Sequence, residues 1–200
     1  MIHNISGVIL AGGASKRFNG LIKAKIVIDG RTIISRIIET IGDIFDEIVI
    51  VTNTPCEYKE LSSCKIIGDQ FLDKGPLGGI HSAMKGSDRE ALFVVAGDMP
   101  LLAKELIVKQ IGFYNTNNCE VLIPKIDQYI EPLHGIYKRT LIKTLEDYLL
   151  GDNDYAIREF LKKVDAHYLQ IEGSEKYKSI FTNINSPEDI LIVKKLLGVD

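Results

Sequence analysis

Short apolar runs alternate with helical patterns through the first half of this 200-residue chain. Residues 8–10 form a continuous apolar run typical of a buried parallel strand, and isoleucines then recur at helical spacing from Thr32 to Gly42. Further strands are expected at residues 47–51, 65–67 and 91–96, and a helix is expected to open between Leu77 and Ile80 and to run to Lys85. Such alternation predicts an α/β fold with three α/β/α layers around a mostly parallel, mixed sheet.

The second half is less regular. Its patterns predict helices at residues 104–114, 140–149 and 155–163, and strands at residues 121–124, 132–137 and 167–171. The last helix has the clearest start, because Ser186 can cap it and Pro187 suits its first position. No repeat or linker interrupts the chain, and 46% of its residues are hydrophobic, so we expect one domain over residues 1–200.

Charge and composition exclude several classes of protein. The formal net charge of −3 argues against general binding to nucleic acid or to acidic membranes. No apolar run reaches the roughly 18 residues of a membrane span, and the first residues lack the basic segment of a signal peptide, so we expect a cytoplasmic protein. The three cysteines form no CxxC pair and the four histidines are scattered, so we expect neither a disulfide framework nor a zinc site.

The segment after the first strand has the composition of a phosphate-binding loop. Residues 11–15 read AGGAS, and such small side chains let backbone N–H groups approach an anion or a purine closely. Lys16 and Arg17 add positive charge beside those donors. The segment fits neither GxxxxGK[ST] nor GxGxxG, so it is either a phosphate loop of another class or an ordinary tight turn.

Polar candidates follow three of the expected parallel strands. The Gly12-Gly13 pair follows the first, Asn53 the second, and Asp98 the strand at 91–96. Ligands of open α/β sheets bind outside the carboxyl ends of the strands. The sequence therefore predicts one ligand site at this edge.

Five sequence blocks carry a resemblance to a known family. They are LAGGASKRF at 10–18 with Lys23 downstream, GPLGGI at 75–80, GDMP at 97–100, EPLHGIY at 131–137 and NINSPED at 183–189. Together they resemble the nucleotidyltransferases of the GT-A-like, Rossmann-like fold, and within them the molybdenum cofactor guanylyltransferases. The first block alone is shared with cytidylyl- and sugar-nucleotidyltransferases.

The resemblance implies Mg²⁺-dependent transfer of GMP from GTP to the terminal phosphate of molybdopterin or its molybdenum form, with pyrophosphate leaving. GTP and the molybdopterin cofactor are the implied partners, and transient contact with cofactor-biosynthesis proteins or a recipient molybdoenzyme is a further option. Two enzymatic alternatives keep the fold: a cytidylyltransferase for the same cofactor and a sugar-phosphate nucleotidyltransferase. A non-enzymatic alternative is a nucleotide-binding accessory protein that delivers the cofactor.

The resemblance also implies catalytic roles. Arg17 and Lys23 would bind the β- and γ-phosphates and stabilise the leaving pyrophosphate, and Asp98 would bind Mg²⁺. The chain departs from the family pattern Gly-Gly-x-Asp-Lys, because it has Ile22 before the lysine, and Lys25 is therefore an alternative to Lys23.

The remaining implied residues bind the two substrates. The residues expected to contact GTP are Leu10, Ala11, Gly12, Gly13, Lys23, Asn53, Asp69, Leu77, Gly78, Gly79 and Asp98. The second glycine of the loop makes room for a purine. Asn183 and Asn185 are expected to hydrogen-bond the pterin of the acceptor, although an Asx turn before the last helix is an alternative for both. Residues 131–134 are expected to line the same pocket, with His134 as a minor candidate for a general base.

Overall fold

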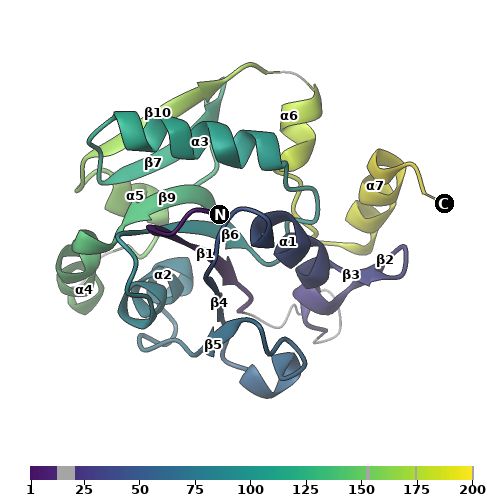
Figure 1. Cartoon of the computed structure of the whole chain (residues 1–200), viewed down its shortest axis with the longest axis horizontal. Helices are drawn as coiled ribbons and strands as arrows, with labels where there is room; N and C mark the ends of the chain where they lie inside the picture. The colour runs from purple at the N-terminus through teal and green to yellow at the C-terminus, as the bar shows by residue number, and fades with distance from the viewer. Residues whose placement is uncertain (13–20, 152–153, 174, 200) are drawn as a thin grey trace.

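A mixed, mostly parallel sheet forms the centre of the protein (Figure 1). In this computed structural model, residues 1–12, 21–151, 154–173 and 175–199 are described. The strand order is β10-β7-β9-β6-β1-β4-β5, with β8 paired to β7. Only β9 and β8 run antiparallel to their neighbours within the described sheet. The strands are β1 (Ile5–Leu10), β4 (Ile48–Val51), β5 (Lys65–Ile67), β6 (Ala91–Ala96), β7 (Val121–Ile126), β8 (Tyr129–Ile130), β9 (His134–Lys138) and β10 (Ala166–Ile171).

Helices cover both faces of this sheet. They are α1 (Ile33–Gly42), α2 (Gly75–Gly86), α3 (Lys104–Thr116), α4 (Ile142–Leu150), α5 (Ile157–Leu161), α6 (Glu175–Ile180) and α7 (Pro187–Leu197). Strand β6 shows why two helical layers are needed, because successive side chains of a strand point to opposite faces. Phe93 and Val95 join the apolar cluster that contains residues of α1 and α3, while Leu92 and Val94 join the cluster of α2, α4 and α5. The predicted three-layer α/β/α fold is confirmed.

The elements missed by the sequence patterns are short. They are the hairpin of β2 (Val27–Ile28) and β3 (Arg31–Thr32), the strand β8, the helix α6, and the 3₁₀ helices η2 (Lys23–Lys25), η3 (Pro55–Tyr58) and η4 (Arg139–Leu141). The β2–β3 turn had a sequence signal, since Asp29 and Gly30 have φ of 50° and 70° and Asp-Gly is a preferred pair in such turns.

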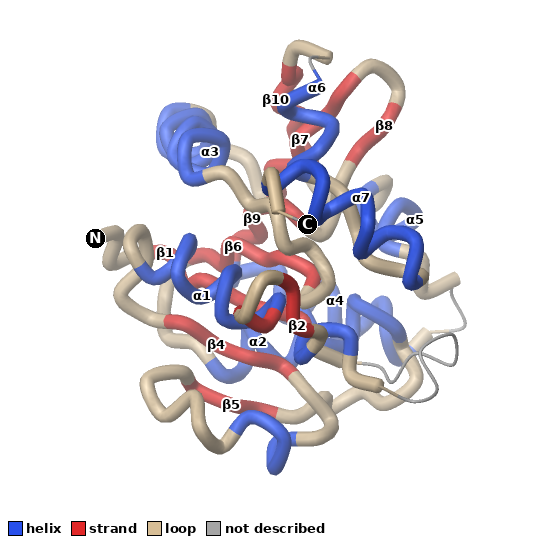
Figure 2. Tube along the Cα trace, turned by 90° about the vertical axis from the view of Figure 1, so that its right-hand side faces the viewer, coloured by secondary structure: helices blue, strands red, loops and turns tan. Residues whose placement is uncertain are grey.

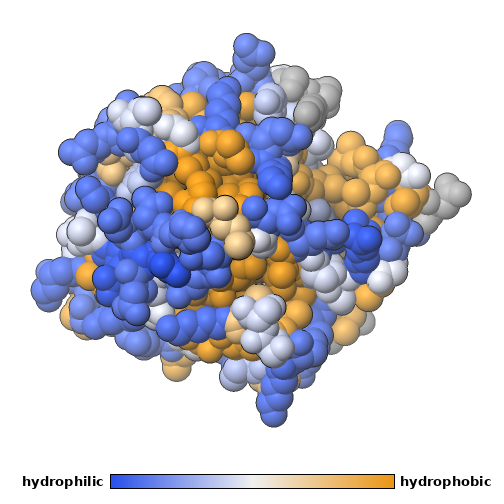
Figure 3. All heavy atoms as spheres, in the orientation of Figure 1, coloured by the Kyte–Doolittle hydropathy of each residue, from blue (hydrophilic) through white to orange (hydrophobic). Residues whose placement is uncertain are grey.

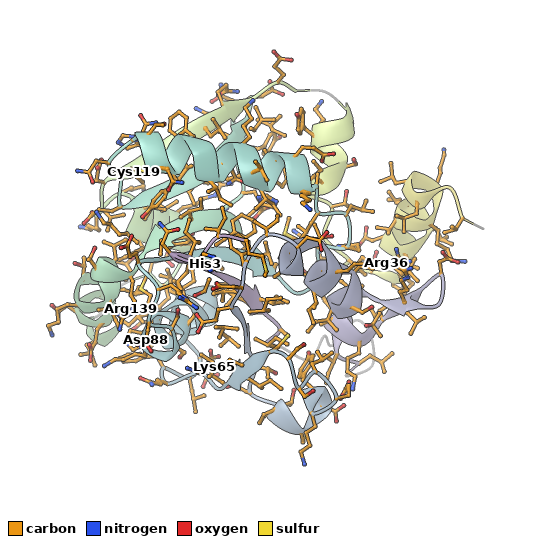
Figure 4. All side chains as sticks on the ribbon, viewed as in Figure 1. His3, Arg36, Lys65, Asp88, Cys119 and Arg139 are labelled. Carbon is orange, nitrogen blue, oxygen red and sulfur yellow. The ribbon has the colours of Figure 1, made fainter. Side chains whose placement is uncertain are left out.

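The amino ends of the parallel strands are held by polar contacts. His3 Nδ1 lies 2.7 Å from Asp46 Oδ2, and the Ser87 hydroxyl, which is buried, donates to Glu47 Oε2 at 2.7 Å. Arg139 lies beside Asp88 at this end of the molecule, with 4.0 Å between Nη2 and Oδ1 (Figure 4).

The last helix leaves apolar side chains at the surface. Val193 of α7 is buried, whereas Leu191, Ile192 and Leu196 are exposed and contribute to the apolar area at the right of Figure 3. Within the part of the chain that is described, no helix combines the length and the apolar character needed to cross a membrane.

Candidate functional site

A cavity of about 370 Å³ lies where β1, β4 and β6 end, beside the start of α2. Figure 2 shows the arrangement of these strands and of α2. The volume of the cavity falls in the range of about 300–1,000 Å³ that is typical of small-molecule sites. Its lining residues are Leu10, Ala11, Gly12, Ile22, Lys23, Ala24, Val51, Asn53, Asp69, Asp73, Gly75, Pro76, Gly79, Ala96, Gly97, Asp98 and Leu133. Gly12, Asn53 and Asp98, which the sequence places after three different strands, therefore meet at one cavity.

Three glycines lie where the backbone segments that form this cavity approach one another or border it. A Cβ at Gly97 would lie 3.0 Å from the Leu10 carbonyl oxygen and 3.1 Å from Ala11 Cα, both backbone atoms that cannot move aside easily. A Cβ at Gly79 would lie 3.1 Å from Leu10 Cδ2. Gly12 differs from both, since a Cβ there would meet no atom of the described residues within 4 Å. Gly97 and Gly79 thus allow β1, β6 and α2 to pack closely, whereas Gly12 leaves space open.

Asn53 and Asp69 form a reciprocal pair at one side of the cavity. Asn53 Nδ2 donates to Asp69 Oδ2 at 2.9 Å, and the Asp69 backbone N–H donates to Asn53 Oδ1 at 3.0 Å. The other carboxylate oxygen of Asp69, Oδ1, is buried without a partner among the described residues. Burial raises the pKa of Asp69, and the hydrogen bond from Asn53 opposes that rise. Asp69 therefore presents an unused acceptor.

Lys23 bridges two distant parts of the chain. Its Nζ donates to Asp98 Oδ2 at 2.9 Å and to Asn185 Oδ1 at 2.6 Å. The side chains of Lys23 and Asp98 are 20% and 21% exposed, so the pair is reachable from solvent but partly shielded. Lys25 points elsewhere, since its Nζ donates to the Glu57 carbonyl at 2.6 Å. Of the two candidate lysines, only Lys23 lines the cavity.

The segment before α7 is tied to the same point. The Ile184 N–H donates to the Asp98 carbonyl oxygen at 3.0 Å. Asp189 Oδ2 accepts from the backbone N–H groups of Asn185 and Ser186, each at 2.8 Å, as part of the capping box that starts α7. This cap orients Asn185, whose side chain contacts Lys23. Asn183 Oδ1 is buried with no partner within the described ranges, and neither asparagine lines the cavity itself.

Several sequence-derived candidates are not among the described residues that line the cavity. Leu77 is fully buried in the core on α2. Gly78 also does not line the cavity, and a Cβ there would lie 2.5 Å from the Phe71 carbonyl oxygen, so this glycine serves the packing of α2. Gly13 and Arg17 fall outside the described residues.

His134 is unsuited to the general-base role considered from the sequence. It is fully buried, and its ring packs edge-on against Phe93 and Phe181, with centroids 5.1 and 5.2 Å apart. Loss of hydration lowers the pKa of His134 to about 4. Of the block 131–134, Leu133 lines this cavity, whereas Glu131 lines a second one.

Sequence reasoning missed lining residues just before α2. Asp73 and Gly75 both have φ of 59°, in the left-handed region, and α2 starts at Gly75 with Pro76 in its first turn. The signal was available, because proline favours the first helical position and glycine tolerates positive φ. The helix was instead expected to open at or after Leu77.

A sequence model of the MobA-like NTP transferase domain matches residues 7–168. The chain belongs to the MobA-like NTP transferase family. It is 36% identical over 207 residues to a protein of Natranaerobius thermophilus named probable molybdenum cofactor guanylyltransferase, covering 99% of this chain and 98% of the relative. It is 32% identical to the molybdenum cofactor guanylyltransferase of Syntrophotalea carbinolica, covering 92% and 88%.

Solved structures agree with this membership. The molybdopterin-guanine dinucleotide biosynthesis protein A of Archaeoglobus fulgidus superposes with a TM-score of 0.80 at 25% identity, covering 96% of this chain and 98% of that one. A CMP:2-keto-3-deoxy-manno-octonic acid synthetase shares the fold, with a TM-score of 0.76 at 12% identity and 98% coverage of both chains. The nucleotidyltransferase fold expected from the sequence is thereby confirmed.

The charges around the cavity of this MobA-like NTP transferase bear on metal binding. Among the lining residues that are described, three carboxylates, of Asp69, Asp73 and Asp98, accompany one lysine, Lys23. No group of three or more His, Cys, Asp or Glu residues gathers in a metal-binding arrangement within the described ranges. Mg²⁺ is commonly held by one or two carboxylates together with substrate phosphates and water. The donor set therefore fits a Mg²⁺ ion that binds together with a nucleotide.

Proposed function

We propose that this chain is a molybdenum cofactor guanylyltransferase, which transfers GMP from GTP to the terminal phosphate of molybdopterin or its molybdenum form. The names of the relatives in Natranaerobius thermophilus and Syntrophotalea carbinolica support the proposal. The observation that carries it is the position of Lys23, whose ammonium group contacts Asp98 at the cavity and Asn185 on the segment before α7. One cation thus lies between the proposed nucleotide side and the proposed acceptor side.

The reaction joins two phosphates without a covalent enzyme intermediate. An oxygen of the acceptor phosphate attacks the α-phosphorus of GTP, the bond from that phosphorus to the β-phosphate oxygen breaks, and pyrophosphate leaves with the electron pair. Negative charge concentrates around the reacting phosphates, so cations and oriented N–H groups supply most of the stabilisation. An acceptor phosphate is already ionised at pH 7, and this agrees with the buried, neutral state of His134.

Lys23 would exchange its carboxylate partner for phosphate when GTP binds. In the free protein its Nζ lies 2.9 Å from Asp98 Oδ2. A triphosphate offers a stronger negative partner, and Asp98 would then be released to hold Mg²⁺, which supplies charge neutralisation at the phosphates. Arg17 would add a second cation in the proposed scheme. Asp98→Asn is expected to abolish the response of activity to Mg²⁺ while leaving the melting temperature within a few degrees of the wild type.

The nucleoside would lie against the Asn53–Asp69 side of the cavity. The buried, unpartnered Oδ1 of Asp69 would accept a hydrogen bond from an N–H or O–H group of the nucleoside, which satisfies an atom that is otherwise costly to bury. Gly12 leaves room for the purine among the described residues, since it lines the cavity and carries no side chain into it.

The test is turnover by the purified chain with Mg²⁺, molybdopterin and each nucleoside triphosphate in turn. Pyrophosphate and the dinucleotide product are measured separately. We expect both products with GTP, and much less of either with CTP, ATP or UTP. Turnover with CTP in place of GTP would overturn the base assignment. Tight binding of GTP without any product would instead favour an accessory, cofactor-delivering protein.

A further inference from the structure

A second cavity, of about 350 Å³, is lined by residues of the β7–β8 hairpin and of the segment that includes α6. These two segments lie side by side in Figure 2. The lining residues of this cavity are Ile126, Asp127, Tyr129, Ile130, Glu131, Lys178 and Phe181. It shares no lining residue with the first cavity. Its lining combines two aromatic rings with two isoleucines, the carboxylates of Asp127 and Glu131, and the ammonium group of Lys178, so it is suited to a flat ring with a polar edge.

Residues of one short loop line both cavities. Glu131 lines the second cavity and Leu133 lines the first, and the Leu133 backbone N–H donates to Glu131 Oε1 at 3.2 Å. The carboxylates of Glu131 and Asp98 are also close enough that the charge of Asp98 raises the pKa of Glu131. The two cavities are therefore neighbours, with residues 131–133 between them.

The carboxylate of Glu131 can accept further hydrogen bonds from a ligand. Among the described residues, Oε1 has the Leu133 N–H as its partner and Oε2 has no hydrogen-bond partner. Burial is the main cause that raises the pKa of Glu131, while the Leu133 N–H and the charge of Arg158 oppose the rise. A carboxylate in such surroundings gains most from a ligand that brings two adjacent N–H donors.

We propose that the second cavity binds the pterin ring of the acceptor, with Glu131 accepting hydrogen bonds from its amino group and adjacent ring N–H, and with Tyr129 and Phe181 contacting the ring. The proposal rests on the proposed function, because it assigns a place to that reaction's acceptor. A pterin in its lactam form carries this donor pair on a planar bicyclic ring, and planar rings associate favourably with aromatic side chains. Guanine carries the same donor pair, so the test must separate the two ligands.

The test compares Glu131→Gln with Glu172→Gln in the full chain. Glutamine keeps the acceptor for Leu133 but replaces the second oxygen by a donor that opposes the pterin edge. We expect the KM for molybdopterin to rise by about tenfold or more in Glu131→Gln, with the Kd for GTP unchanged. Glu172 is exposed and lines neither cavity, so Glu172→Gln should match the wild type in both constants.

A binding measurement without turnover separates this inference from the proposed function. The fluorescence of 6-hydroxymethylpterin, titrated with protein, should report binding to the wild type and to Glu172→Gln, and binding at least about tenfold weaker to Glu131→Gln. Tyr129→Ala should weaken it too, and this variant should fold because Tyr129 is 77% exposed. Loss of pterin binding in these variants supports the inference even if no GMP is transferred.

Two results would overturn the inference. One is a wild type that transfers GMP while Glu131→Gln and Tyr129→Ala keep the wild-type KM for molybdopterin and wild-type pterin binding. The other is a Glu131→Gln variant whose Kd for GTP rises while pterin binding is unchanged, since the cavity would then serve the guanine. Either result leaves the guanylyltransferase proposal standing.

Discussion

Replacing Gly12 by alanine adds a methyl group that should hinder binding of the ligand without disturbing the packing of the protein itself. Among the described residues, a Cβ at Gly12 would meet no atom within 4 Å, and Gly12 is not among the described glycines with positive φ. The described part of the free protein therefore has room for the methyl group. Because Gly12 lines the proposed nucleotide cavity, the methyl group should collide only with a bound nucleotide.

The substitution should stabilise the protein slightly and weaken its binding of GTP. A compatible Gly→Ala change stabilises a protein by about 0.4–1 kcal/mol, because it reduces the entropy of the unfolded chain. A nucleotide pushed away from the Gly12 backbone loses a hydrogen bond to a charged group, and such a bond contributes about 1.5–3 kcal/mol. At about 1.4 kcal/mol for each tenfold change, the Kd for GTP should rise by roughly 10- to 150-fold.

Calorimetric titration of GTP and urea unfolding of the same variant measure the two effects. Gly112→Ala is the matched control, since Gly112 lies exposed in α3, lines neither cavity, and has no described atom within 4 Å of a Cβ built on it. Both variants should be as stable as the wild type or more so, and only Gly12→Ala should bind GTP weakly. Wild-type affinity in Gly12→Ala would refute the placement of the nucleotide against this backbone, and a destabilised variant would refute the packing argument.

Three further predictions concern the cation, its support and a buried histidine. Lys23→Met should lower kcat/KM for GMP transfer by about 100-fold or more in a steady-state assay, because the transition state loses a hydrogen-bond donor. Lys25→Met removes only a contact to Glu57, so its kcat/KM should stay within about twofold of the wild type in the same assay. Equal losses in the two variants would contradict the assignment. Asp189→Asn should leave the Kd for GTP unchanged and lower kcat by about tenfold. The reason is that Asp189 holds the backbone of Asn185, whose side chain contacts Lys23. An unchanged kcat would show that this cap serves only the start of α7. Burial lowers the pKa of His134 to about 4, below its unfolded value near 6.5, so its neutral form stabilises the fold above pH 6.5 and that stability is lost as the pH falls toward 4. This loss amounts to about 2–3 kcal/mol between pH 7 and pH 4.5, and urea unfolding at both values should show it in the wild type and a correspondingly smaller loss in His134→Leu.

The regular elements could be predicted because their patterns are local. Strand β6 was expected at residues 91–96 and lies at Ala91–Ala96, since six consecutive apolar residues suit a strand buried on both faces. The start of α7 was expected at Ser186 from its capping signal, and the structure has the cap there. The single-domain reading of residues 1–200 stays a prediction.

The contacts between distant segments needed the structure. Lys23 and Asn185 are 162 residues apart in sequence, and no local pattern shows that their side chains meet. The GPLGGI block was expected to contribute Leu77, Gly78 and Gly79 to the nucleotide site. Gly79 lines the cavity together with Gly75 and Pro76, whereas the contacts of Leu77 and Gly78 with a nucleotide stay a prediction, and both residues also serve the packing of α2. From the sequence alone, a glycine that is needed to avoid a clash with a neighbouring carbonyl group cannot be distinguished from one that is needed to make room for a ligand.

The most direct test of the central claim follows the phosphorus atoms of GTP. The purified chain is incubated with Mg²⁺, molybdopterin and GTP labelled at either the α- or the γ-phosphate, and the products are separated. The account predicts that the α-label enters the guanine dinucleotide cofactor and that the γ-label leaves in pyrophosphate. Transfer of the γ-label to the acceptor, or release of both labels without a dinucleotide product, would contradict it.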